Sequence, residues 1–363
     1  MNIIVTCVLF ILALVKKKSH ILCLLLFLLM WSLWGWNTWN GDYIAYENRY
    51  YDSVNTSNTQ EFGFLLINCL FVWLGIPFQT YMIIFSYVVL FILYKLIIKN
   101  NPLPAFVSAI YFLLFIQEFV FMRNYLTNTL MLYGLFAIIN ERKYCYKKFF
   151  ALAVLSFSIH TTAILFLFFL PFLNEKKYSF GKIFLLNILL VAFMIFLVYP
   201  NLLPLLNSFF QEKMNYYSPE ENSITNSSYF HLLLVLSILI EHKYVVSKID
   251  SRLTHRQQRM YSIIRNFNIM SLFYISIYYL APYFASRFLR FLFTVNLFYT
   301  TSVCFYAYKA LSFKWQFLSL MSFLLLIISI LLFLYISTLP FTVIPLYKCN
   351  LIWGNDFYEP IMQ

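Results

Sequence analysis

Long apolar runs separated by short polar segments make up most of the chain. They occupy residues 1–15, 20–36, 63–76, 78–98, 103–121, 124–140, 149–173, 183–204, 229–241, 262–281, 286–308 and 315–339. A helix needs about 20 apolar residues to cross the ~30 Å hydrocarbon core of a bilayer, and most of these runs approach that length. The pattern predicts an all-α polytopic membrane protein with about 10 to 12 transmembrane helices.

Two of the runs are expected to be re-entrant or broken helices. Run 63–76 has only 14 residues, which is short for a crossing. Run 149–173 is long, but polar residues interrupt its centre: Ser156, Ser158, His160, Thr161 and Thr162. Irregular backbone at membrane depth is tolerated where it lines a cavity.

The basic residues suggest a topology. Lys16–Lys18 follow the first run, and the segment 243–265 holds six Lys or Arg with one acid. If runs 63–76 and 149–173 each enter and leave on one side, most of the 26 Lys and Arg fall in cytoplasmic loops. Residues 37–61 and 205–228 are then extracytoplasmic loops. No linker and no repeat divides residues 1–363, which predicts a single integral membrane domain.

Composition and charge exclude several other classes. The chain is 62% hydrophobic and 11% charged, unlike a soluble domain. The net charge of +12 is explained by cytoplasmic loops and does not indicate a nucleic-acid partner. The six cysteines are scattered without metal-ligand spacing and no Asp-x-Asp pair occurs, so neither a metal nor another cofactor is predicted.

Four of the ionisable residues at or inside apolar runs are candidates for a site, because a charged group there costs roughly 2.5–3.5 kcal/mol on insertion scales. Arg123 directly precedes run 124–140, at the start of a helix on the predicted outer face; it either extends to the interface or binds pyrophosphate. His160 is either a satisfied buried residue or a proton acceptor. Arg287 and Arg290 are three residues apart on one helix face, as an anion clamp requires.

The predicted outer loop after the second run supplies further candidates. Asp42, Tyr43 and Tyr46 belong either to a solvated loop beside an interfacial aromatic belt or to a carbohydrate surface, and Asp42 is the acid nearest the membrane. Glu61 starts a helix, where the helix dipole alone accounts for a carboxylate. Asn68 lies in an apolar run and needs a partner, for which a backbone carbonyl would serve.

Several of these motifs occur together in a consistent order. They are the Gly-Asp-Tyr-x-x-Tyr segment 41–46, the Glu-Phe-Gly-Phe segment 61–64, Arg123, the Phe-Ser-Ile-His-Thr-Thr segment 157–162, and Arg287. Over roughly residues 30–300 the chain resembles the EpsG/Wzy family of polysaccharide polymerases. It departs from the family where Asn124 and Tyr125 follow Arg123, since members often have Gln about two positions after that arginine.

The resemblance implies a membrane glycosyltransferase of the bacterial cytoplasmic membrane. Such enzymes join undecaprenyl-pyrophosphate-linked oligosaccharides on the outer face of the membrane, for capsule, exopolysaccharide or O-antigen. The implied partners are this lipid-linked substrate, the lipid bilayer, a chain-length regulator and a flippase. The implied catalytic residues are His160 and Asp42. The implied substrate-binding residues are Arg123, Arg287, Arg290, Tyr43, Tyr46 and Glu61.

Three other classes share part of this pattern. A flippase for lipid-linked oligosaccharides would also hold pyrophosphate with arginines, but it should show two similar halves and a charged central cavity, and the sequence shows neither. An O-antigen ligase shares the donor and the outer arginines, and genomic context would separate it from a polymerase. A membrane acyltransferase also uses His and Arg, and its requirement for an acyl donor would distinguish it.

Overall fold

The computed structural model describes residues 2–55, 61–141, 143–176, 178–179, 181–182, 185, 188–189, 221–273, 275, 282–337 and 345–355. The chain divides into two compact units. The first contains Met1–Leu170 and Ile330–Gln363, and the second contains Pro171–Ser329. The described residues are almost entirely helical, which confirms the all-α prediction.

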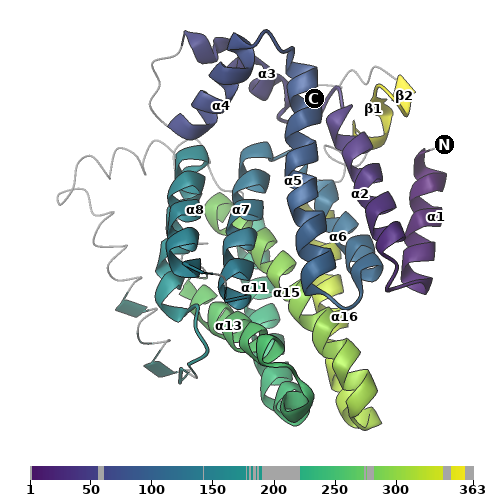
Figure 1. Ribbon diagram of the computed structural model, residues 1–363, viewed down its shortest axis with the longest axis vertical. Coiled ribbons are helices and arrows are strands. Elements are labelled where there is room, and N and C mark those ends of the chain that lie inside the picture. Colours follow the sequence, from purple (N-terminus) through teal and green to yellow (C-terminus); the bar gives the residue numbers. More distant parts are fainter. Residues whose placement is uncertain are drawn as a thin grey trace. The chain divides into compact units, whose positions relative to one another are not determined.

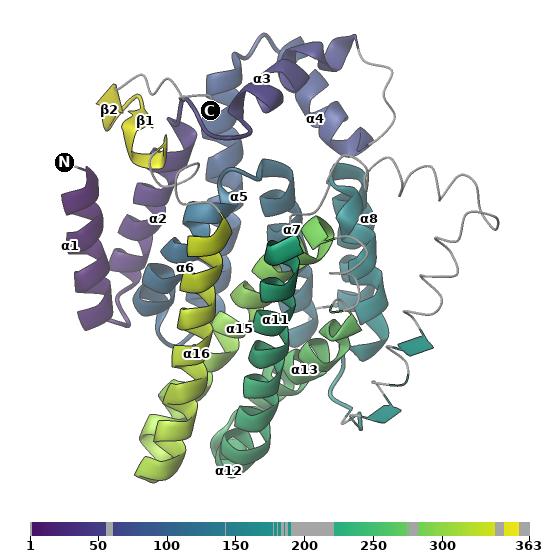
Figure 2. The same ribbon diagram turned by 180° about the vertical axis from the view of Figure 1, so that it is seen from behind.

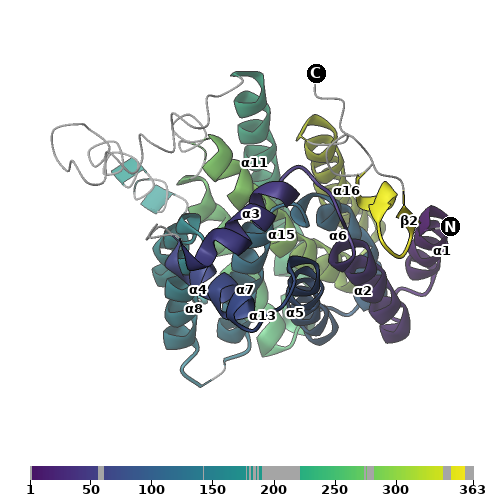
Figure 3. The same ribbon diagram turned by 90° about the horizontal axis from the view of Figure 1, so that it is seen from above.

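The first unit is a bundle of helices capped by a short C-terminal hairpin. Its elements are α1 (Asn2–Val15), α2 (His20–Gly35), α3 (Tyr43–Tyr51), η1 (Asp52–Val54), α4 (Phe62–Trp73), α5 (Phe78–Asn100), α6 (Pro104–Glu118), α7 (Met122–Ile139), α8 (Cys145–Ile159), η2 (Thr161–Phe172), β1 (Cys349–Asn350) and β2 (Gly354–Asn355). The last two residues of η2 belong to the second unit. Helix α2 packs against α5 and α6, and α7 packs against α8 (Figure 1). Helices α3 and α4 lie at the end of the unit where α8 finishes, as Figures 1 and 3 both show.

In the second unit, polar contacts as well as apolar packing join buried helices. Its elements are α11 (Glu221–Glu241), η3 (His242–Val246, one π turn), α12 (Ser247–Ile249), η4 (Asp250–Arg252), α13 (His255–Ser271), α15 (Pro282–Ala310) and α16 (Phe313–Ser337), whose last residues belong to the first unit (Figure 2). The buried amides of Asn268 and Asn296 bond each other in both directions, at 2.8 and 2.9 Å. Such bonds join helices where the hydrophobic effect between them is weak.

Several helices have the length and composition of membrane spans. Among the described residues, three are long and apolar enough: Phe78–Asn100, Arg287–Ala310 and Phe313–Phe333. Shorter apolar helices cover Ile3–Val15, His20–Gly35, Phe62–Trp73, Pro104–Ile116 and Thr161–Phe172. These helices agree with a multi-pass membrane protein. The exact number of crossings, the single membrane domain and the sidedness of the loops stay predictions.

The break predicted within run 149–173 is confirmed. Helix α8 ends at Ile159, His160 has extended backbone (φ −150°, ψ 120°), and the 3₁₀ segment η2 follows at once. Run 63–76 is a helix of only 12 residues, α4. It ends in a Schellman motif, in which Gly75 has φ +69° and the backbone N–H of Ile76 donates to the carbonyl of Phe71.

The predicted loop 37–61 is partly helical, which corrects its description as a loop. Helix α3 occupies Tyr43–Tyr51, and the side chains of Tyr46 and Tyr50 on it are buried. Their four-residue spacing places both rings on one helix face. Aromatic residues are abundant in this chain, so this short amphipathic pattern did not stand out. The other predicted loop, 205–228, lies mostly outside the described residues; its part from Glu221 onward belongs to α11.

The C-terminal end of α2 is capped by residues from far along the chain. The last carbonyls of a helix have no partner within it, so they need one elsewhere. The side-chain amide of Asn350 donates to the carbonyls of Ser32 and Leu33, at 2.9 and 3.0 Å. The side-chain amide of Gln79 donates to the backbone carbonyl of Gly35 at 2.6 Å. The C-terminal segment is therefore a structural part of the first unit.

Replacing Asn350 with alanine is expected to destabilise the protein by about 2 kcal/mol or more. The change leaves the carbonyls of Ser32 and Leu33 without their donor, and the backbone N–H groups of Ile352 and Trp353 without their acceptor. Thermal unfolding of the purified protein measures the loss. Leu351→Ala, at a side chain that is 54% exposed, is the control and should change the Tm little. Equal Tm values for both variants would contradict this capping role.

Candidate functional site

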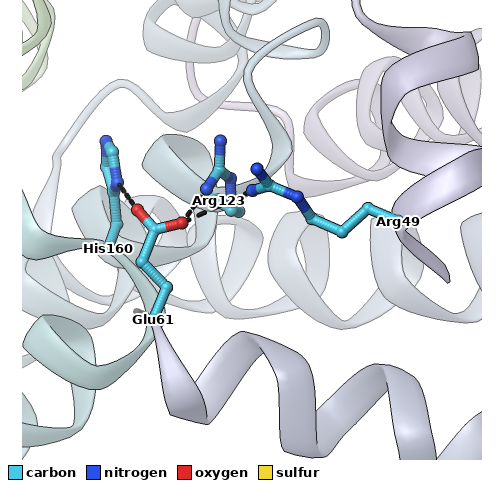
Figure 4. Close-up of polar contacts among 4 residues, drawn as sticks. All are labelled: Arg49, Glu61, Arg123 and His160. Atoms are coloured by element: carbon cyan, nitrogen blue, oxygen red, sulfur yellow. Dashed lines mark hydrogen bonds and ion pairs between the residues drawn. The ribbon is translucent and has the colours of Figure 1, made fainter. Parts of the chain in front are cut away.

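One carboxylate in the first unit gathers three basic side chains from distant parts of the chain. Glu61 precedes α4, and its Oε1 lies 2.8 Å from Nδ1 of His160. Its Oε2 is contacted by Nη1 of Arg123 and lies 3.5 Å from Nη1 of Arg49. Figure 4 shows the carboxylate between His160 on one side and the two guanidinium groups on the other. We call these four residues the Glu61 cluster.

The backbone conformation of Glu61 explains why its side chain contacts the basic groups of the cluster and does not cap α4. Glu61 has φ +61° and ψ +44°, in the left-handed region, and its side chain makes no capping bond to α4. Few residues with a Cβ adopt this conformation, and those that do often lie at functional sites. The helix dipole alone is therefore an incomplete explanation for Glu61. The carboxylate is positioned for its contacts with the basic groups.

A close helix approach brings Glu61 to His160. Gly63, in the first turn of α4, lies against Ser158 near the end of α8. A Cβ on Gly63 would lie 2.2 Å from Oγ and 2.9 Å from Cβ of Ser158, and 3.0 Å from its backbone carbonyl carbon. Glycine is the residue that fits where backbones approach this closely.

Gly63→Ala is expected to destabilise the first unit by about 1–3 kcal/mol and to weaken the contact of Glu61 with His160. The added methyl group overlaps Ser158, so α4 and α8 must move apart. Thermal unfolding measures the first effect, and activity of the variant in membranes measures the second. Gly41→Ala is the matched control, because nothing lies within 4 Å of a Cβ built there. An unchanged Tm and activity for Gly63→Ala would contradict a role of this contact.

His160 owes its position to the break in its helix. It follows the last residue of α8, is buried, and its backbone N–H still bonds to the carbonyl of Ser156 at 2.8 Å. Its side chain extends from the end of α8 to Glu61. The carboxylate holds Nδ1, so the ring orientation is set and the other ring nitrogen, Nε2, faces away from Glu61. This is the arrangement in which a carboxylate orients a histidine for proton transfer.

Arg123 enters the cluster from the first turn of α7 and is held on more than one side. Its guanidinium carbon lies 5.6 Å from the ring centroid of Tyr46 and 5.7 Å from that of Phe64. Arginine stacks in this way on aromatic faces. Nη1 bonds to Glu61, whereas Nε has no hydrogen-bond partner within the described part of the chain. Arg123 therefore keeps donor capacity for a further anion.

Arg49 is the member of the cluster that was not predicted as a site residue. It lies on α3, and its side chain is 51% exposed, compared with 18% for Arg123. Its signal in the sequence is that it is the only basic residue among the acids of segment 37–61. With one carboxylate and two guanidinium groups, the cluster carries one net positive charge before His160 is counted.

Two further predicted site residues, Asp42 and Tyr43, lie at the start of α3. Asp42 precedes α3, the helix that carries Tyr46 and Arg49. The hydroxyl of Tyr43 donates to Gln79 at 3.2 Å, and burial, followed by the charge of Glu47, raises the pKa of Tyr43 to about 12. Tyr43 is therefore a neutral hydrogen-bonding group at physiological pH.

Two predicted arginines are not members of the Glu61 cluster, and one predicted contact is not found among the described residues. Arg287 and Arg290 belong to α15 of the second unit, and Arg290 is buried there. The expected backbone partner of Asn68 is wrong: neither polar atom of its buried amide has a partner among the described residues.

Comparison with known proteins gives one match. A model of the EpsG family matches residues 20–350. No curated protein and no solved structure matches the chain. The matched range contains all four residues of the Glu61 cluster.

Proposed function

The chain belongs to the EpsG family of membrane proteins linked to exopolysaccharide biosynthesis, and we propose that it polymerises lipid-linked oligosaccharide repeat units. The growing chain is carried on undecaprenyl pyrophosphate. It is transferred to a hydroxyl group of the next lipid-linked unit, on the outer face of the bacterial cytoplasmic membrane. The observation that carries the proposal is the Glu61 cluster, which combines an oriented histidine with two guanidinium groups.

The chemistry needs one base and one stabiliser of negative charge. The acceptor hydroxyl attacks the anomeric carbon, so a carbon–oxygen bond forms there as the bond to the phosphate oxygen breaks. The proton of the hydroxyl passes to His160, and the bonding electron pair leaves with the pyrophosphate. Arg123 and Arg49 neutralise the charge that develops on this leaving group. Glu61 orients His160 and both guanidinium groups.

The predicted site residues have different roles in this reaction. His160 is favoured over Asp42 as the base because it is bonded to the carboxylate that also holds Arg123. Tyr46 supports Arg123 through its ring. Arg287 and Arg290 remain proposed ligands of a second lipid pyrophosphate, since the reaction uses a donor and an acceptor that both carry one.

Polymer length in the native host tests the function. The gene is deleted and then restored, and extracted polysaccharide is separated by gel. Single repeat units in the deletion strain and a restored ladder of long chains are expected. Long chains stranded on carrier lipid would instead identify a ligase. A purified wild-type protein that converts lipid-linked units to a ladder would exclude a flippase, which moves the substrate without extending it.

A further inference from the structure

Three buried polar side chains follow Arg123 on α7, and each has a polar group that makes no hydrogen bond within the described part of the chain. They are Asn124, Thr127 and Asn128, and each is at most 9% exposed. The amide nitrogens of the two asparagines and the hydroxyl of Thr127 have no partner in the part of the chain that the structure describes. Each such group destabilises the folded protein, because burial removes its hydrogen bonds to water and supplies no other partner. Leucine or valine would fill the same space at lower cost.

These side chains form one short face beside the Glu61 cluster. The spacing of 124, 127 and 128 places them on one side of a helix. The same side continues with Met131 and Leu135, which are buried and apolar. With a rise of 1.5 Å per residue, the polar part ends about 8 Å along the axis from Arg123. We call these three residues the polar face of α7.

Helix packing does not account for this face. Buried asparagines in membrane helices commonly join neighbouring helices, as the reciprocal bonds of Asn268 and Asn296 do in the second unit. On α7 the donors of Asn124 and Asn128 make no bond to a neighbouring helix among the described residues. A ligand with its own hydroxyl and carbonyl groups would satisfy them.

We propose that the polar face of α7 binds the sugar that is attached directly to the pyrophosphate of the lipid-linked substrate. The proposal rests on the proposed function, which places that pyrophosphate at Arg123. The sugar bonded to this pyrophosphate must then lie within about the length of one sugar unit from the guanidinium of Arg123. Neutral amides and hydroxyls suit the hydroxyl groups of a sugar, and they add no charge that would compete with the pyrophosphate. The first turns of α7 therefore bind both parts of one substrate.

Three apolar replacements of similar size test this site: Asn124→Leu, Thr127→Val and Asn128→Leu. Two probes are titrated against the purified protein: the lipid-linked repeat unit from the deletion strain, and undecaprenyl pyrophosphate without sugar. The triple variant is expected to keep or raise the Tm, because it removes unmade hydrogen bonds. It should bind the repeat unit about tenfold or more weakly, and the sugar-free lipid as the wild type does.

Thr129→Val is the matched control. Thr129 is also buried with an unpaired hydroxyl on α7, but at about 100° per residue it falls on the opposite side of the helix. Its replacement should leave the binding of both probes unchanged. Wild-type affinity of the triple variant for the repeat unit would overturn the proposal, as would a lowered Tm with equal loss of both probes. If the sugar-specific loss is seen but the wild type makes no polymer, the sugar site stands and the polymerase function fails.

Discussion

Replacing Arg123 with alanine is expected to abolish long polymer and to lower the rate of repeat-unit consumption by about a hundredfold or more. The guanidinium is anchored by Glu61 and by the rings of Tyr46 and Phe64, and its Nε still has donor capacity. It is thus fixed in place before any anion arrives. Without it, the leaving pyrophosphate loses its best-oriented source of positive charge. The measurement is the polymer ladder in the complemented deletion strain, with membrane levels of each variant compared by immunoblot.

Two further variants separate charge from geometry. Arg123→Lys is expected to remain strongly impaired, because an ammonium group cannot stack on two rings and bond in parallel as a guanidinium does. Arg49→Ala should lower the rate only a few-fold, because Arg49 is 51% exposed and 3.5 Å from Glu61. Wild-type polymer length from Arg123→Ala, at normal membrane level, would refute the role given to this residue.

The apolar pattern predicted helix positions well because a membrane span must be apolar along its whole length. Run 20–36 became α2 (His20–Gly35), and run 78–98 became α5 (Phe78–Asn100). The break at His160 was also readable, since hydroxyl residues and a histidine in mid-run are unfavourable in an uninterrupted span. These features depend on local sequence, which is why they could be predicted.

The Glu61 cluster could not be assembled from the sequence, because its contacts join residues far apart in the chain. Glu61 is 62 positions from Arg123 and 99 from His160. Taken separately, each has an ordinary local explanation: a helix dipole, an interfacial arginine or a satisfied histidine. The packing of α4 against α8, which Gly63 permits, brings Glu61 to His160, and α7 and α3 supply the two arginines. Arg49 was not predicted, because a lone basic residue among the acids of segment 37–61 gives no sign of which acid it contacts.

Replacing Glu61 with glutamine is expected to lower kcat about a hundredfold without raising KM for the lipid-linked substrate. Glutamine keeps the size of the side chain and can still accept a bond from Arg123. It cannot stabilise positive charge on His160 as that ring takes up the proton of the acceptor. The guanidinium groups lose their internal carboxylate and so bind the pyrophosphate at least as well. Initial rates at varied substrate concentration, with purified variants in one lipid, give both constants.

Stability distinguishes this catalytic effect from structural damage. Glu61→Ala removes one partner of a nearly buried ion pair, for which a loss of about 3–5 kcal/mol is expected, whereas Glu61→Gln should keep most of the wild-type Tm. Glu47→Gln, at a carboxylate of α3 outside the cluster, is the control and should leave both kcat and Tm unchanged. A full rate for Glu61→Gln would show that the charge on this carboxylate takes no part in the reaction. A raised KM with an unchanged kcat would instead place Glu61 in substrate binding, because the loss would then be equal in the ground and transition states.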